Sequence, residues 1–273
     1  MRETEFFNGV RVPVIGQGTW HLGEDAAKRK TEVSALCAGI DAGLTVIDTA
    51  EMYGDGASEE LVGEAIRGQR DKVVLVSKVY PHNASRSGVV AACERSLRRL
   101  GTDRLDVYLL HWSGRFPLPE TVDGFEQLRE AGKIRSWGLS NFDRDDLRRA
   151  PDGCATNQVL YNLGSRGIEF DLLPWQQRLG MPLMAYSPLG QGPTLLRHPL
   201  LAEIGARHGV TVAQIALAWV IRQPGVIAIP KASSLEHVHQ NVGAGAVVLD
   251  AEDCLSLDNA FPAPRSKQPL DIL

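Results

Sequence analysis

The stretch VVLVSKVYPHNASRSGVVAACERSLRRLGTDRLDVYLLH, residues 73–111, contains the strand–helix–strand unit that sets the fold. Residues 73–79 and 105–111 are short apolar runs, and the first is rich in β-branched side chains, which is typical of buried strands. Residues 86–100 place apolar side chains at helical spacing, so that one face can pack on a sheet. A helix between two such strands predicts that the strands are parallel.

The same alternation of apolar runs and amphipathic segments continues along the chain. Further strands are expected at residues 45–48, 134–139, 156–160, 182–186 and 226–229, and helices at residues 28–42, 120–131, 201–208, 212–222, 235–242 and 251–260. The unbroken repeat predicts an α/β fold and favours a closed (β/α)8 TIM barrel over an open doubly wound sheet. Because no linker-like composition interrupts it, a single barrel domain over residues 1–273 is predicted.

A hairpin is predicted close to the N-terminus. Asn8 and Gly9 stand between the apolar pair Phe6-Phe7 and Val10. Asn-Gly between apolar residues is typical of a two-residue hairpin turn. We expect this N-terminal β-hairpin to close the bottom of the barrel.

The composition limits the classes of function. Of the 273 residues, 44% are hydrophobic and 23% are charged, as in an ordinary globular protein, and the formal net charge is −4. Such a balance argues against a nucleic-acid or membrane-surface partner. The four cysteines form no CxxC pair, so no zinc site is expected. Without a signal-peptide pattern or a membrane span, a cytoplasmic protein is expected, with a monomer as the default.

Polar and reactive side chains follow the expected strands. These residues are Asp48, Tyr53, Lys78, His111, Ser140, Asn141, Gln158, Tyr186 and Lys231. Each alone has an ordinary explanation, such as a turn-forming aspartate or a solvent-exposed lysine. In an α/β barrel, however, the carboxyl ends of the strands meet at one mouth, where the chemistry takes place. The combination therefore predicts a single site.

The residue types fit the reduction of a carbonyl group. Lys78 lies in an apolar strand, so its partly desolvated ammonium needs a carboxylate, which Asp48 can supply. A carbonyl that gains a hydride also needs a proton, and a free tyrosine with a pKa of about 10 is a weak donor. We expect Lys78 to lower the pKa of Tyr53, which would act as the general acid, while His111 donates a hydrogen bond to the carbonyl.

Together, these motifs resemble the aldo-keto reductases. The matching segments are GQGTW from Gly16, IDTAEMYGDGASEELVGEAI at residues 47–66, KVYPHN, LLHW at residues 109–112, SNF at residues 140–142, NQVLYN, AYSPLGQG and IPKASS from Ile229. The resemblance covers nearly the whole chain. It implies a (β/α)8 barrel that reduces aldehydes and ketones with NADPH, without metal or flavin. It also implies that Tyr53 is the acid, that Lys78 and Asp48 tune it, and that His111 orients the carbonyl.

The resemblance also implies a set of binding residues. The nicotinamide cofactor is expected to contact Thr19, Trp20, Asp48, Ser140, Asn141, Gln158, Tyr186, Ser187, Leu189, Gln191, Lys231, Ala232, Ser233, His237, Gln240 and Asn241. Within this set, Ser140, Asn141 and Gln158 would hold the carboxamide, and Tyr186 would stack on the ring. Trp20, Tyr53, His111 and Trp112 are expected to line the substrate pocket.

The chain departs from the family pattern at the adenosine end. Ala232, His237 and Gln240 stand where serine, arginine and glutamate are usual, whereas Lys231 is kept. A largely neutral histidine is a weaker phosphate partner than arginine, so the NADPH preference is expected to be relaxed toward NADH. The short C-terminal tail favours small substrates. The overall pattern is most similar to the bacterial branch with methylglyoxal reductases, so 2-oxoaldehydes such as methylglyoxal are expected substrates.

Other classes of protein fit the sequence less well. Gly16-x-Gly18 lacks the third glycine and the helix of a dinucleotide-binding Rossmann motif. His237 and His239 would face different sides of a helix, which argues against a metal site. A barrel that binds the nicotinamide cofactor without turnover, as a sensor or scaffold, stays open as the alternative. The intact set Asp48, Tyr53, Lys78 and His111 argues against it.

Overall fold

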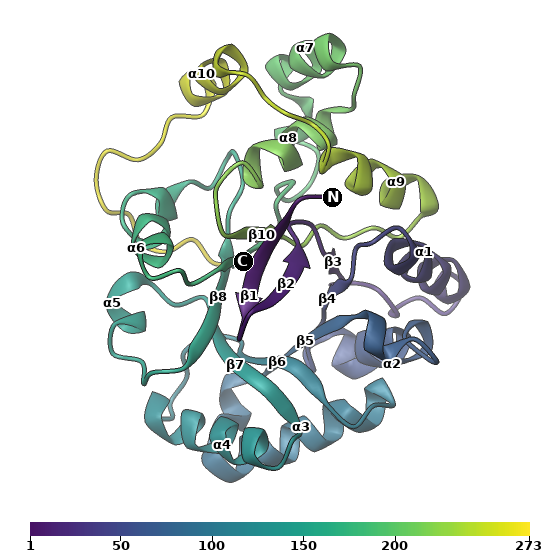
Figure 1. Cartoon of the computed structure of the whole chain (residues 1–273), viewed down its shortest axis with the longest axis vertical. Coiled ribbons are helices and arrows are strands. Elements are labelled where there is room, and N and C mark those ends of the chain that lie inside the picture. Colours follow the sequence, from purple (N-terminus) through teal and green to yellow (C-terminus); the bar gives the residue numbers. More distant parts are fainter.

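Eight parallel strands form the centre of the computed structural model, which describes residues 1–273. They follow one another around the sheet in chain order: β3 (Gln17–Gly18), β4 (Val46–Asp48), β5 (Val74–Val79), β6 (Leu105–Leu110), β7 (Ile134–Ser140), β8 (Cys154–Leu160), β9 (Leu183–Tyr186) and β10 (Val226–Ala228). The first and last strands also meet, because Ile15 bridges Ala228 in parallel and Gly18 bridges Lys231. The sheet is therefore a closed barrel (Figure 1), which confirms the predicted (β/α)8 architecture.

The closure depends on a glycine in β3. A Cβ atom on Gly18 would lie 2.5 Å from the backbone oxygen of Ile229, a distance that no side chain permits. Gly18 therefore lets the backbone of β3 approach the segment that follows β10, and its N–H donates to Pro230 O at 3.1 Å. β3 has no strand signature in the sequence, because it has only two residues and no apolar run.

Helices surround the barrel (Figure 1). They are α1 (Arg29–Asp41), α2 (Ala57–Ala65), α3 (Arg86–Leu100), α4 (Leu118–Glu130), α5 (Arg144–Leu147), α6 (Leu172–Arg178), α7 (Pro199–His208), α8 (Val212–Val220), α9 (Leu235–Ala244) and α10 (Ala251–Ala260). The predicted bounds of α3 and α10 are confirmed. At α3, the Ser85 hydroxyl accepts the N–H of Gly88, and Gly101 ends the helix in a left-handed conformation. None of these helices combines the length and the apolar character that spanning a membrane requires.

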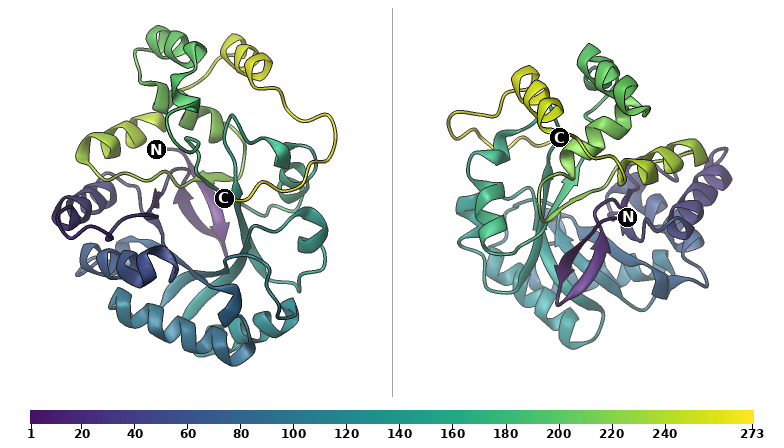
Figure 2. Two further views of the ribbon diagram at one scale, coloured as in Figure 1. Left: turned by 180° about the vertical axis from the view of Figure 1, so that it is seen from behind. Right: turned by 45° about the horizontal axis from the view of Figure 1, so that its top comes forward.

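The N-terminal hairpin closes one end of the barrel. β1 (Glu3–Phe7) and β2 (Val10–Pro13) pair antiparallel, and Asn8 and Gly9 both have positive φ, as the predicted turn requires. Phe6, Phe7 and Val12 pack with inward-facing strand residues in a buried cluster. Seen from the opposite side (Figure 2, left), the C-terminal tail crosses the other end and stops near the barrel axis. The hairpin thus fills one end of the barrel, and a binding site can form only at the other end, where the strands have their carboxyl ends.

Candidate active site

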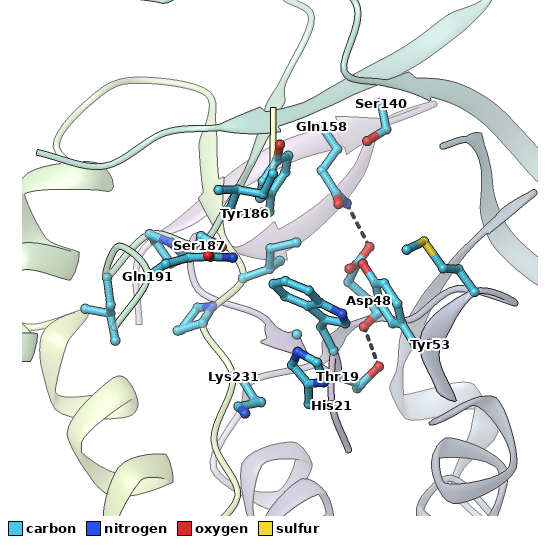
Figure 3. Close-up of a pocket in the computed structure, with 18 of the residues that line it drawn as sticks. Thr19, His21, Asp48, Tyr53, Ser140, Gln158, Tyr186, Ser187, Gln191 and Lys231 are labelled. Carbon is cyan, nitrogen blue, oxygen red and sulfur yellow. Dashed lines mark hydrogen bonds between the residues drawn. The ribbon is translucent and has the colours of Figure 1, made fainter. Parts of the chain in front are cut away.

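A pocket of about 490 Å³ lies at the carboxyl ends of the strands. Its polar lining contains Thr19, His21, Asp48, Tyr53, His111, Ser140, Asn141, Gln158, Tyr186, Ser187, Gln191 and Lys231. Its apolar walls include Trp20, Met52, Trp112, Leu189 and Leu273. Figure 3 shows side chains from separate strands converging on this space, as the ends of barrel strands do.

Lys78 lies buried beneath the pocket, behind Asp48 and Tyr53. Its side chain is 0% exposed, and its Nζ donates to Asp48 Oδ2 at 2.8 Å, to Thr49 O at 2.8 Å and to Tyr53 Oη at 2.9 Å. All three ammonium protons therefore have acceptors. The predicted pairing of Lys78 with Asp48 is present, and it brings the Tyr53 hydroxyl to the same ammonium group.

Asp48 is fixed from a second side. Gln158 Nε2 donates to Asp48 Oδ1 at 2.7 Å (Figure 3). Thr19 Oγ1 donates to the Asp48 backbone oxygen at 2.9 Å. These contacts join β3, β4, β5 and β8, so the position of the carboxylate is set by the barrel rather than by a flexible loop.

The expected direction of the Tyr53 pKa is wrong. Burial, with a smaller contribution from the charge of Asp48, raises the pKa of Tyr53 well above its usual value. The Asp48 carboxylate adds to the effect of burial, because it disfavours a second negative charge on the phenol beside it. The phenol therefore keeps its proton in the free protein, and it is available as a donor.

His111 lies next to Tyr53 and is uncharged. The two ring centroids are 5.8 Å apart in an edge-on arrangement. Burial, together with the charge of Lys78, lowers the pKa of His111 well below its usual value. A neutral imidazole carries one N–H, and Nδ1 is buried without a partner, so the ring can donate from Nε2. A neutral His111 can therefore still donate the hydrogen bond to the carbonyl that is expected of it.

Tyr186 is held rigidly at the opposite wall. Its hydroxyl donates to Asn141 Oδ1 at 2.8 Å, and Asn141 Nδ2 donates to His111 O at 3.1 Å. Burial raises the pKa of Tyr186 to about 12, so the hydroxyl remains a donor at neutral pH. These two hydrogen bonds link the ends of β6, β7 and β9. They hold the Tyr186 ring in place, as a surface for stacking requires.

The remaining pocket lining suits a nicotinamide dinucleotide. Ser140 and Gln158 present hydroxyl and amide groups, which match a carboxamide. After Tyr186, the chain turns through Ser187, Gly190 and Gly192, which all have positive φ. Such turns expose backbone N–H groups that can face phosphates. Lys231 has no carboxylate partner, so its charge is free for an anion.

Most of the residues expected in the site, whether catalytic or binding, line this pocket. The exceptions are Lys78, which lies beneath Asp48 and Tyr53, and the group Ala232, Ser233, His237, Gln240 and Asn241. Ala232 and Ser233 follow Lys231 in the segment between β10 and α9, and the other three residues lie within α9. Its role stays a prediction. Gln240 Nε2 donates to Glu236 at 3.3 Å within the helix.

The pocket also contains residues that were not predicted from the sequence. His21 and Met52 are neighbours of the predicted Trp20 and Tyr53, and Gly190 and Gly192 lie beside Gln191, so their positions could have been inferred. The position of Leu273 could not have been inferred, because nothing in the sequence indicates that the C-terminal tail returns to the mouth of the barrel.

Comparisons with known proteins agree with this geometry. A model of the aldo/keto reductase family matches residues 14–261. Methylglyoxal reductase YeaE of Escherichia coli (strain K12) is 55% identical, and the alignment covers 98% of each chain. An aldo-keto reductase from Klebsiella pneumoniae, crystallised with NADPH, is 56% identical with a TM-score of 0.97, covering 100% of this chain and 99% of that one. The thermostable aldo-keto reductase Tm1743, in complex with epalrestat, is 39% identical with a TM-score of 0.89, covering 95% and 99%.

Proposed function

The chain belongs to the aldo/keto reductase family and is an NADPH-dependent oxidoreductase of carbonyl compounds, and we propose that its substrates are small 2-oxoaldehydes and that Tyr53 supplies the proton. The observation that carries the proposal is the hydrogen bond that Lys78 Nζ, of the buried Lys78–Asp48 pair, donates to Tyr53 Oη at 2.9 Å. A structural tyrosine has no need of a buried ammonium at its hydroxyl.

The cofactor is held by residues at the ends of β7 to β10. Ser140, Asn141 and Gln158, which line the pocket, would hold the carboxamide, and Tyr186 would stack on one face of the nicotinamide. The turn after Tyr186 and the Lys231 ammonium take the phosphates. When bound, NADPH supplies the hydride that the carbonyl carbon receives. The chain's own contribution is to leave the other face of the ring open to the substrate and to exclude water from it.

Tyr53 and His111 act on the carbonyl oxygen. The neutral His111 imidazole donates a hydrogen bond that fixes the carbonyl, and Tyr53 donates its proton as negative charge develops on that oxygen. An alkoxide is a stronger base than a phenolate, so the raised pKa of Tyr53 does not prevent the transfer. The tyrosinate that remains is stabilised by the Lys78 ammonium until a proton returns from solvent.

The substrate class follows from the pocket walls and from the relatives. Trp20, Met52, Trp112 and Leu273 give the pocket that Tyr53 lines part of its apolar surface, which suits a small carbonyl compound. A relative that is 55% identical is a methylglyoxal reductase. We expect kcat/KM with NADPH to be higher for methylglyoxal than for a simple aldose or a nitrobenzaldehyde. A clear preference for the aldose or the aromatic aldehyde would contradict the assignment to 2-oxoaldehydes.

Lys231 is proposed to select NADPH by contacting its 2′-phosphate. Lys231→Ala should weaken NADPH binding by about tenfold more than NADH binding, since a hydrogen bond to a charged group contributes roughly 1.5–3 kcal/mol and this site is exposed. Titration of the two cofactors by fluorescence quenching measures both Kd values. Lys30→Ala, which removes an exposed lysine on α1, is the control. Equal losses for NADPH and NADH would show that Lys231 does not contact the 2′-phosphate.

Monomeric state and cytoplasmic location belong to the same proposal. The pocket lining contains the proposed acid together with residues proposed to hold the cofactor and the substrate, which supports a site built by one subunit. The net charge of −4 supports the absence of a nucleic-acid or membrane-surface partner.

A further inference from the structure

The segment that follows Tyr53 has an unusual backbone. Gly54, Asp55 and Gly56 have φ angles of 55°, 52° and 96°, so three successive residues lie in the left-handed region before α2 begins at Ala57. A left-handed conformation is unfavourable for Asp55, which has a Cβ atom. Such a turn persists only where its surroundings hold it, and here it directly follows the proposed acid.

Glu51 holds the chain before the turn. Its side chain is 6% exposed. Its Oε1 accepts hydrogen bonds from Tyr80 N at 2.9 Å and from Asn83 Nδ2 at 3.0 Å. Its Oε2 accepts from Arg95 of α3 at 3.3 Å. The chain entering the turn is therefore tied to the end of β5 and to α3.

Glu59 holds the chain after the turn. Its side chain is 0% exposed. Its Oε1 accepts the Ser77 hydroxyl at 2.6 Å, and its Oε2 accepts Arg99 Nε at 2.6 Å. Ser77 and Lys78 are neighbours in β5, and their side chains point to opposite faces of the strand. Glu59 is thus bound to the back of the strand that carries Lys78.

Arg99 also contacts the turn itself. A Cβ atom on Gly56 would lie 2.5 Å from Arg99 Cδ and 2.5 Å from Nε, so the arginine stem packs directly against the left-handed backbone. Arg95 and Arg99 stand one helical turn apart on the same helix, α3. A single rigid element therefore holds both ends of the segment that carries Tyr53.

We propose that Arg99 and Glu59 are a positioning pair that holds the left-handed turn, and through it the Tyr53 hydroxyl, against Lys78. The inference rests on the proposed function of Tyr53. Charge supports it as well: burial lowers the pKa of Lys78, whereas the carboxylates of Asp48 and Glu59 oppose that change. Glu59 therefore helps to keep Lys78 charged from behind the strand.

The pair should affect turnover rather than cofactor binding. Tyr186 ends β9 and Lys231 follows β10, and β10 lies on the side of the barrel away from α3 (Figure 1). A shift of the turn would lengthen the contact between Tyr53 and Lys78 but would leave Tyr186 and Lys231 in place. Misplacement of a catalytic group by about 1 Å can cost 10²-fold in rate.

Arg99→Met is the variant that tests the pair, because it keeps an apolar stem against Gly56 and removes the guanidinium. We expect kcat with NADPH and methylglyoxal to fall by about 10- to 100-fold, with little change in the Kd for NADPH. Arg99→Lys should recover part of the loss. Arg98→Met, which changes the neighbouring exposed arginine, should leave kcat unchanged.

A second variant separates positioning from folding. Arg99→Met leaves Glu59 as a buried carboxylate without its cation, so we also propose Arg99→Met/Glu59→Gln, which buries no unpaired charge. Its thermal midpoint should be close to that of the wild type, while kcat stays low. Wild-type kcat in this folded double variant would overturn the proposal, as would an equal loss of kcat and NADPH affinity in it. Tyr53→Phe, measured in parallel, distinguishes this failure from failure of the proposed acid, because it tests Tyr53 without disturbing the turn.

Discussion

Tyr53→Phe is expected to lower kcat for carbonyl reduction by about 10²- to 10⁴-fold, the usual contribution of a general acid. The substitution removes only the hydroxyl that Lys78 Nζ contacts at 2.9 Å, and phenylalanine fills the same space. The residues proposed to hold the carboxamide and the phosphates lie in β7 to β10 or follow them, whereas Tyr53 follows β4. The Kd for NADPH should therefore change little. Single-turnover oxidation of bound NADPH, together with fluorescence titration of the cofactor, measures the two quantities separately.

A matched tyrosine serves as the control for this prediction. The Tyr80 hydroxyl makes no hydrogen bond, although its ring lies near Trp112 at 5.7 Å between centroids. Tyr80→Phe should therefore retain wild-type turnover. Wild-type kcat in Tyr53→Phe would remove Tyr53 as the proton donor and leave the His111 imidazole as the remaining candidate.

Asp48→Asn should be costly for both stability and activity. It leaves the Lys78 ammonium, which is 0% exposed, without its counter-ion, and breaking a buried ion pair on one side typically costs about 3–5 kcal/mol. Turnover should also collapse, because both the charge of Lys78 and the position of Tyr53 depend on this carboxylate. Urea unfolding at neutral pH, with kcat measured in native buffer, tests both effects.

The double variant Asp48→Asn/Lys78→Met should separate stability from function. Without a buried charge it should recover most of the free energy of unfolding, because neutral replacement of a buried pair is often neutral or stabilising. It should nevertheless remain inactive. Glu3→Gln, which breaks the exposed pair with Arg11, should cost about 1 kcal/mol or less and serves as the reference. Retained turnover in the double variant would contradict the proposed role of the pair.

Much of the barrel could be predicted from the sequence because its elements have local signatures. The apolar run before Lys78 and the helical spacing in residues 86–100 identify β5 and α3 without knowledge of their neighbours. The pairing of Asp48 with Lys78 was also predictable, since an ammonium in an apolar strand requires a carboxylate. That residues 1–273 form one domain stays a prediction.

Other features depend on contacts that only the folded chain creates. β3 exists because Gly18 can approach Ile229, which lies at the other end of the sequence. The pKa of Tyr53 is raised by burial together with the charge of Asp48, whereas the sequence alone points only to the charge of Lys78. Leu273 in the pocket wall, and the two arginines of α3 behind the Tyr53 turn, likewise leave no local pattern.

The most direct measurement of the central claim follows the absorbance of NADPH during incubation of the wild-type protein with methylglyoxal. We expect one NADPH to be oxidised for each carbonyl group reduced, and we expect Tyr53→Phe, with cofactor bound, to abolish nearly all of this oxidation. If NADPH binds but is not oxidised in the presence of methylglyoxal or other small carbonyl compounds, Tyr53 is not a catalytic acid, and the barrel is a cofactor-binding sensor or scaffold instead.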